Sequence, residues 1–138
     1  MTEFRTFRFC HQHPAYLKIG DKGGKGTKIF RMGKEGTNAA HVHVDVGIGH
    51  HKQMSRSMLS NRIIVPDRDL LYSLVSDDLF GVRPIITTHF MDPTYKPRFG
   101  VDHPGLDLVP FNRHQTDENY EVYWPLDHVF EVIDIGRY

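Results

Sequence analysis

Short runs in which apolar and polar residues alternate make up most of the chain, and Gly, Pro, Asn and Asp residues separate them. Alternation with a period of two is typical of a strand with one buried face, and the separating residues favour the tight turns that join antiparallel strands. We therefore predict a mainly β fold, a small antiparallel sheet domain. The predicted extended segments are residues 3–10, 27–32, 41–46, 83–90, 106–111, 121–126 and 128–135.

One segment departs from this alternation and has the pattern of a helix. In DRDLLYSLV, residues 67–75, the apolar residues fall on one side of a helical projection, and Asp67 is a suitable N-cap. We expect at most one or two short helices in the whole chain. The polar run 50–62 fits a loop, GDKGGKG at 20–26 predicts a turn, and the Pro- and Gly-rich stretch 91–105 predicts a second loop.

Length and composition predict a single domain over residues 1–138 and exclude several classes of partner. No repeat, low-complexity tract or linker divides the chain, and 138 residues suit one hydrophobic core. Lys plus Arg and Asp plus Glu both number 17, so no net charge favours nucleic acid as a partner. No apolar run reaches the roughly 20 residues of a membrane span. Cys10 is the only cysteine, which excludes an internal disulfide and predicts a small buried hydrophobe there.

The ten histidines are the most unusual feature of the composition, because neutral imidazole is the commonest protein ligand for metal ions. In HVHVDV, residues 41–46, the side chains of His41, His43 and Asp45 project to one face of the predicted strand, and three valines project to the other. An isolated H-x-H pair is more often half-exposed strand surface than a ligand pair. The pattern therefore needs support from elsewhere in the chain.

A second cluster, DHPGLDL, places His103 and Asp107 four residues apart across a turn that Pro104 and Gly105 favour. Taken alone, it fits a solvent-facing histidine beside an Asx-stabilised turn equally well. Together with His43, however, the cluster forms the three-ligand set of a catalytic zinc site, which leaves a fourth position open for water. One cysteine cannot build a thiolate-rich structural site. The same ligand set also suits Fe(II) and Mn(II), and we predict zinc.

A third element, FRFCHQHPAYLKIGD, places His11 and His13 on one face at the end of a predicted strand. Either residue alone also fits a surface position at a strand end. The chain contains no H-E-x-x-H motif, so a histidine and not a helix-borne glutamate has to supply proton transfer.

These segments resemble the lysostaphin-type zinc metallopeptidases, peptidoglycan endopeptidases with a small antiparallel β fold. In that family an H-x-x-x-D motif supplies two zinc ligands, and the second histidine of a later H-x-H motif supplies the third. The resemblance places these roles on His103, Asp107 and His43, and it makes His41 a catalytic histidine. It also makes His11 catalytic, because the family's other such histidine ends a strand about nine residues before a Gly-Asp turn.

The two halves of the resemblance come in the opposite order to that of the family, in which H-x-x-x-D precedes H-x-H. Residues 8–46 resemble the family's second half and residues 83–135 its first half, which is the pattern of a circular permutation. Residues 47–82 would then be the new connection. Such a rearrangement is physically reasonable because chain termini can be relocated to exposed loops without changing the contacts that form a site.

The resemblance implies a zinc-dependent endopeptidase that hydrolyses peptide bonds in cell-wall peptidoglycan through a metal-activated water. Tyr95, Phe99, Tyr120 and Trp124 are candidates to line a groove for short Gly- or Ala-containing peptides, although core packing is favoured for Trp124. The N-terminus lacks the pattern of a signal peptide, which fits a phage-encoded lysin or virion component that acts on the wall. The oligomeric state stays open.

Two other functions compete with this one. The first is a catalytically inactive zinc-binding module of a phage particle or cell envelope, and the second is a metal-free β domain whose histidines form a pH-sensitive surface. Six histidines are not expected to be ligands in any case. They are His13, His50, His51, His89, His114 and His128.

Overall fold

The computed structural model describes residues 4–10, 15–33, 40–76, 78–111 and 120–135. Within these residues the fold is mainly β, as expected, with antiparallel sheets and short helices. In chain order the elements are β1 (Arg5–Cys10), β2 (Lys22–Gly23), β3 (Lys28–Arg31), β4 (Val42–Ile48), α1 (Arg56–Ser60), α2 (Arg68–Ser73), the 3₁₀ helix η1 (Leu74–Ser76), β5 (Pro84–Thr88), α3 (Tyr95–Phe99), β6 (Leu106–Pro110), β7 (Glu121–Tyr123) and β8 (Phe130–Glu131).

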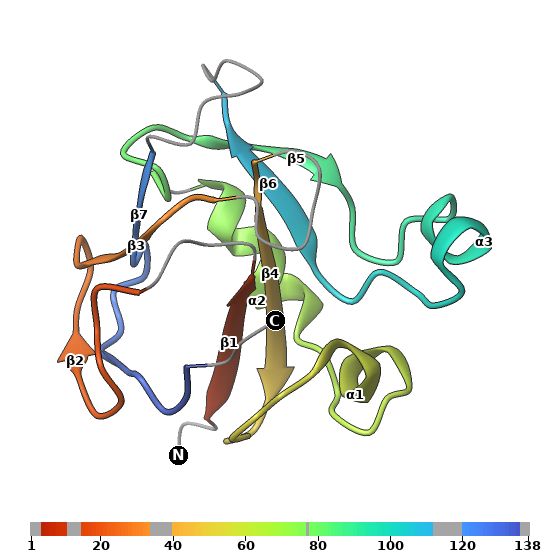
Figure 1. Cartoon of the computed structure of the whole chain (residues 1–138), viewed down its shortest axis with the longest axis horizontal. Coiled ribbons are helices and arrows are strands. Elements are labelled where there is room, and N and C mark those ends of the chain that lie inside the picture. Colours follow the sequence, from red (N-terminus) through yellow and green to blue (C-terminus); the bar gives the residue numbers. More distant parts are fainter. Residues whose placement is uncertain (1–3, 11–14, 34–39, 77, 112–119, 136–138) are drawn as a thin grey trace.

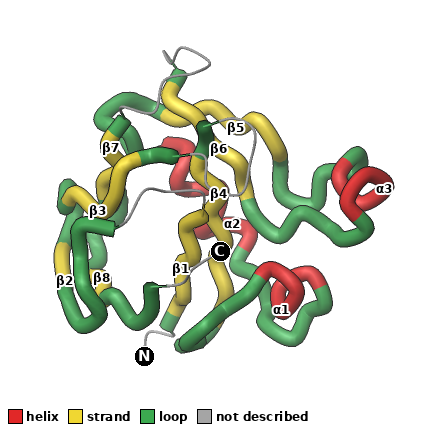
Figure 2. Tube along the Cα trace, viewed as in Figure 1, coloured by secondary structure: helices red, strands yellow, loops and turns green. Residues whose placement is uncertain are grey.

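A four-stranded antiparallel sheet in the order β1-β4-β6-β5 forms the centre of the molecule. Two small antiparallel pairs, β2 with β8 and β3 with β7, lie to one side of it, while α1 and α3 lie to the other (Figure 1). Helix α2 packs against β4 (Figure 2). Strands β4 and β6 thus each have a strand partner along both edges.

Both faces of β4 are buried, but they differ in chemistry. Val42, Val44 and Val46 are fully buried on the face that packs into the main core. His43 and Asp45 project to the opposite face, where they too are buried. The alternation predicted from the sequence is therefore present, with one apolar face and one polar face, and the polar face is covered by protein instead of lying at the surface.

Aromatic side chains join the central sheet to the β3–β7 pair. The ring centroid of Phe7 lies 4.9 Å from that of Trp124, and the centroid of Phe9 lies 5.4 Å from that of Phe30. Trp124 is buried in this core, as favoured from the sequence, and its indole Nε1 donates to the His128 carbonyl. Cys10 is also buried, which confirms the prediction of a small buried hydrophobe.

The predicted helix at 67–75 is confirmed as α2 together with η1. Asp67 is its N-cap, since the carboxylate accepts a hydrogen bond of 3.0 Å from the backbone N–H of Leu70. The other carboxylate oxygen of Asp67 accepts from Arg5 Nε at 2.6 Å, which ties the start of α2 to β1. Among the described residues no helix is long and apolar enough to cross a membrane.

Segments 50–62 and 91–105 contain the helices α1 and α3 instead of loop alone, which gives three short α-helices where one or two were expected. Helices α1 and α3 each have five residues, which is little more than one turn and too short to produce a repeating pattern. Only Leu59 is buried in α1, and no residue is buried in α3. Strand β2 likewise lies within the predicted turn 20–26, where it pairs with β8 over two residues.

Candidate metal centre

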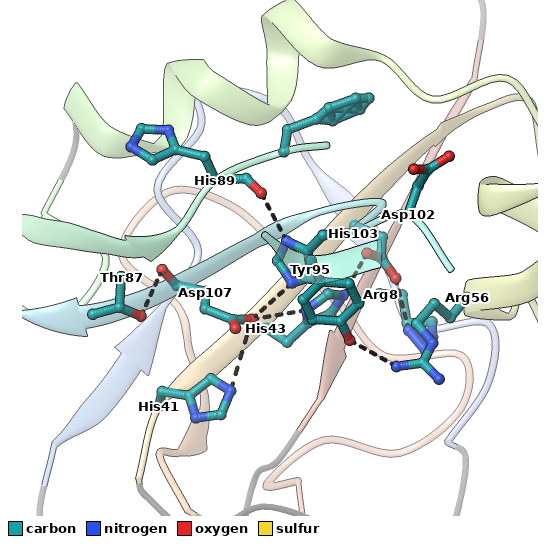
Figure 3. Close-up of polar contacts among 12 residues, drawn as sticks. Arg8, His41, His43, Arg56, Thr87, His89, Tyr95, Asp102, His103 and Asp107 are labelled. Atoms are coloured by element: carbon teal, nitrogen blue, oxygen red, sulfur yellow. Dashed lines mark hydrogen bonds and ion pairs between the residues drawn. The ribbon is translucent and has the colours of Figure 1, made fainter. Parts of the chain in front are cut away.

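Strand pairing brings the two motifs of the sequence together. In the register between β4 and β6, His43 lies directly opposite Asp107, and His43 Nδ1 is 2.9 Å from Asp107 Oδ1. The turn before β6 folds back as predicted, so that His103 Nε2 lies 3.3 Å from the same oxygen (Figure 3). One nitrogen from each histidine and one Asp107 oxygen lie within 4.8 Å of one another, a group able to hold a metal ion.

The outward nitrogen of each imidazole has its own hydrogen-bonding partner. His103 Nδ1 lies 2.9 Å from the carbonyl oxygen of His89, and His43 Nε2 lies 2.6 Å from Asp45 Oδ1. Metal-binding histidines are usually held in this way, with the second ring nitrogen hydrogen-bonded to a carbonyl or carboxylate. The inward nitrogens of His43 and His103 are thereby directed at Asp107, which is the arrangement a bound cation needs.

Gly105 allows the H-P-G-L-D segment to approach β4. A Cβ atom built at this position would overlap the carbonyl oxygen of Val44 and Oδ1 of Asp45. Only a residue without a side chain fits there, so the glycine between the two predicted ligands has a steric role as well as a turn-forming one.

The carboxylates of the site favour a positive charge at its centre. Burial alone would lower the pKa of His43, but Asp45 and Asp107 raise it to about 10. Burial alone would raise the pKa of Asp107, yet hydrogen bonds from His103 and His43 hold it well below its usual range. The pKa of Asp45 is lowered against the same burial effect by His43 and then by Arg8. A proton on His43 or a bound cation can supply the charge that these groups favour.

His41, predicted to be catalytic, lies at the edge of the group. Its Nε2 is 3.7 Å from Asp107 Oδ1, and 14% of its side chain is exposed. His11, the second predicted catalytic residue, lies outside the described residues, and so do His13 and His114. In the described part of the chain, four further histidines are not members of the metal-binding group. These are His50, His51, His89 and His128.

No family model, curated protein or solved structure matches this chain. The resemblance to the lysostaphin-type peptidases therefore stays a prediction from the motifs.

Two of the predicted groove residues, Tyr95 and Phe99, belong to α3 beside the site. The ring centroid of Tyr95 in α3 is 4.6 Å from that of His103, and Phe99 packs against Tyr95 at 4.5 Å. Trp124 belongs to the main core, as favoured from the sequence, and Tyr120 packs against that core. Helix α3 therefore supplies two aromatic side chains to the candidate groove.

Two arginines lie at the site without a signal in the sequence. Arg8 Nη1 donates to Asp45 Oδ2 at 2.7 Å, and Arg56 Nη1 donates to the Tyr95 hydroxyl at 2.9 Å. Arg8 is opposite Asp45 in the β1–β4 register, and the two residues are 37 positions apart in the chain. Only the pairing of β1 with β4 brings Arg8 and Asp45 together, so no local sequence pattern could have indicated their contact.

Proposed function

We propose that this chain is a zinc-dependent endopeptidase that hydrolyses peptide bonds in peptidoglycan. The observation that carries the proposal is the convergence of His43, His103 and Asp107 with both outward imidazole nitrogens held by acceptors. Catalytic zinc sites use three protein ligands and keep one position open, whereas structural sites are closed by a fourth ligand. Among the described residues the group offers three ligands, which supports a catalytic site over a structural one.

The donor set suits the metal that the motifs predict. Two imidazole nitrogens and one carboxylate oxygen are common ligands of catalytic zinc, and the buried acceptors behind the two rings keep the inward nitrogens in place. Zinc held there would supply Lewis-acid chemistry, activating a water molecule and polarising a carbonyl group. The negative charge of Asp107 and Asp45 favours a cation over an empty or neutral centre.

The residues around the ligands have roles that the contacts support. His41 stands at the partly exposed edge of the group and can accept a proton from the attacking water or hold one for the leaving amine. The Tyr95 ring covers His103 and offers a flat apolar surface to a small peptide side chain, while Arg56 holds the Tyr95 hydroxyl. Small glycine or alanine peptides fit such a surface.

The substrate class depends on the resemblance of the motifs to those of lysostaphin-type peptidases, with the two halves in permuted order. By the same resemblance His11 is the second catalytic histidine. A phage lysin or virion component would meet this substrate at the bacterial wall, which is where we propose that the protein acts.

Metal analysis and a wall-lysis assay test the proposal together. Protein purified without chelator should contain about one zinc per chain and should reduce the turbidity of a bacterial wall suspension. His103→Ala should lose both properties, because a buried ligand is removed. His128→Ala is the matched control, since His128 is exposed and its side chain is not part of the group. Less than about 0.2 zinc per chain in the wild type would contradict the metal centre.

Replacing the catalytic histidines separates chemistry from metal binding. His41→Ala should keep zinc while lowering turnover by roughly 10² to 10⁴, the usual range for a lost general acid or base. We expect the same of His11→Ala and a far smaller effect of His13→Ala. Zinc bound at full occupancy without lysis of any wall preparation would instead support the inactive zinc-binding module.

A further inference from the structure

Asp45 is the most deeply buried charged side chain in the described part of the chain, with 0% of its surface exposed. A buried carboxylate is costly unless it is paired and hydrogen-bonded. Asp45 has a partner for each oxygen, because Oδ1 lies 2.6 Å from His43 Nε2 and Oδ2 accepts from Arg8 Nη1 at 2.7 Å. The three side chains form a continuous chain of contacts from the half-buried Arg8 to the candidate ligand His43.

We propose that Asp45 and Arg8 are positioning residues of the metal centre, which set the orientation and ligand strength of His43. Asp45 holds the outward nitrogen of His43 so that Nδ1 faces His103 and Asp107. Arg8 holds the second oxygen of Asp45, which prevents the carboxylate from turning away. This inference rests on the metal centre of the proposed function, and it does not depend on the peptidase activity.

The strand register gives the arrangement its rigidity. Arg8 is paired with Asp45 and Cys10 with His43 across the β1–β4 ladder, so all four side chains lie on one face of two hydrogen-bonded strands. Gly105 closes the space on the other side of Asp45, since even a methyl group there would overlap Oδ1. The carboxylate therefore has little freedom to adopt another position.

The two imidazoles of the site are held by different kinds of acceptor. His103 depends on the backbone carbonyl of His89, which no side-chain substitution removes, whereas His43 depends on a carboxylate. A carboxylate behind an imidazole raises the basicity of the ring more than a neutral carbonyl does, and loss of such a partner typically lowers metal affinity about 10- to 100-fold. His43 is thus the ligand whose strength Asp45 adjusts.

Asp45 is not itself a member of the ligand group. Its Oδ1 contacts Nε2 of His43, whereas the nitrogen that faces Asp107 is Nδ1 on the other side of the imidazole ring. Among the described residues the group that could hold an ion consists of His43, His103 and Asp107. A direct ligand and a positioning residue predict different outcomes when Asp45 is changed.

The test is the zinc affinity of Asp45→Asn and Arg8→Met, measured by competition with a chromophoric chelator. Asp45→Asn keeps the side-chain volume and should weaken zinc binding about 10- to 100-fold. Arg8→Met should weaken it by a smaller factor, and the double variant should be no weaker than Asp45→Asn, because Arg8 acts through Asp45. The visible absorption of the Co(II)-loaded protein should change in both single variants, since the position of a ligand changes.

The matched control is Asp67→Asn, because the Asp67 carboxylate pairs with Arg5 of the same strand β1 at 2.6 Å and caps α2 through Leu70, and among the described residues it is not part of the metal-binding group. It should lower the melting temperature without changing zinc affinity or the Co(II) spectrum. Unchanged zinc affinity in folded Asp45→Asn, or complete loss of zinc as in His103→Ala, would overturn the positioning role. If Asp45→Asn fails to fold, unchanged affinity in Arg8→Met overturns it.

Failure of this inference can be told from failure of the proposed function. A wild-type protein that binds no zinc contradicts the metal centre and the inference with it. A wild type that binds zinc, with an affinity that Asp45→Asn leaves unchanged, contradicts the inference alone. If the wild type binds zinc but cleaves no wall preparation, and Asp45→Asn and Arg8→Met bind zinc more weakly, the result supports the inference and contradicts the peptidase activity.

Discussion

Gly105→Ala is the substitution whose effect follows most directly from the structure. The change adds one carbon atom, and that Cβ would overlap the Val44 carbonyl oxygen and Asp45 Oδ1 and lie 2.9 Å from the Val44 carbonyl carbon. Val44 is in the middle of β4, which is hydrogen-bonded to β1 along one edge and to β6 along the other. The backbone there cannot move aside without breaking strand pairing on both edges.

Two opposing effects determine the magnitude. Replacing glycine by alanine stabilises a protein by about 0.4–1 kcal/mol where the new side chain fits, because the unfolded chain loses freedom. Overpacking a rigid site typically costs about 1–3 kcal/mol, and a clash with backbone atoms belongs at the upper end of that range. We therefore expect a net loss of about 2 kcal/mol in the free energy of unfolding. For a domain of this size that loss lowers the melting temperature by roughly 8 °C.

Thermal unfolding followed by circular dichroism, with chelator present so that metal does not contribute, measures this effect. Gly24→Ala is the control, because nothing lies within 4 Å of a Cβ built at Gly24. It should leave the melting temperature unchanged or slightly raised. A Gly105→Ala protein that melts within about 2 °C of the wild type would refute the close approach of this segment to β4.

Three further predictions concern stability away from the metal centre. Asp67→Ala removes the N-cap of α2 and the ion pair with Arg5, and should lower the free energy of unfolding by about 1–2 kcal/mol in a urea titration. The control Asp127→Ala removes an exposed carboxylate and should change the free energy of unfolding little. Burial alone would raise the pKa of Asp67, but hydrogen bonds from Arg5 and a backbone N–H lower it. The ionised carboxylate therefore stabilises the folded protein above the unfolded pKa of about 3.9. This contribution is lost as the pH falls through the lower folded pKa. Urea titrations at pH 6 and at pH 3 should show the Asp67→Ala deficit shrinking at the lower pH, and a deficit that grows on acidification would contradict the sign. Gln53 has a positive φ of 62°, so Gln53→Gly should raise the free energy of unfolding by about 0.5–1 kcal/mol, while Lys52→Gly, without a positive φ, should lower it in the same assay.

The strands and one helix could be predicted from the sequence because their signals are local. Alternation along 41–46 indicated a strand with valines on one face and His43 and Asp45 on the other, and the side-chain period of two makes this a property of neighbouring residues. Asp67 before an apolar helical stretch indicated α2 in the same way. Helices α1 and α3 gave no such signal, since one turn with at most one buried residue has no period to detect.

The residue types of the candidate metal centre were also evident from the sequence, but its assembly was not. The spacing of His103 and Asp107 and the H-x-H pair are local patterns, whereas His43 and Asp107 lie 64 residues apart and meet only through the β4–β6 register. The contact of Arg8 with Asp45 and the steric need for Gly105 arise from the same cause. A sequence pattern determines which face of a strand a side chain occupies. The pairing and register of the strands depend on burying the apolar faces of all strands of the sheet together. This burial involves residues that are distant in the chain.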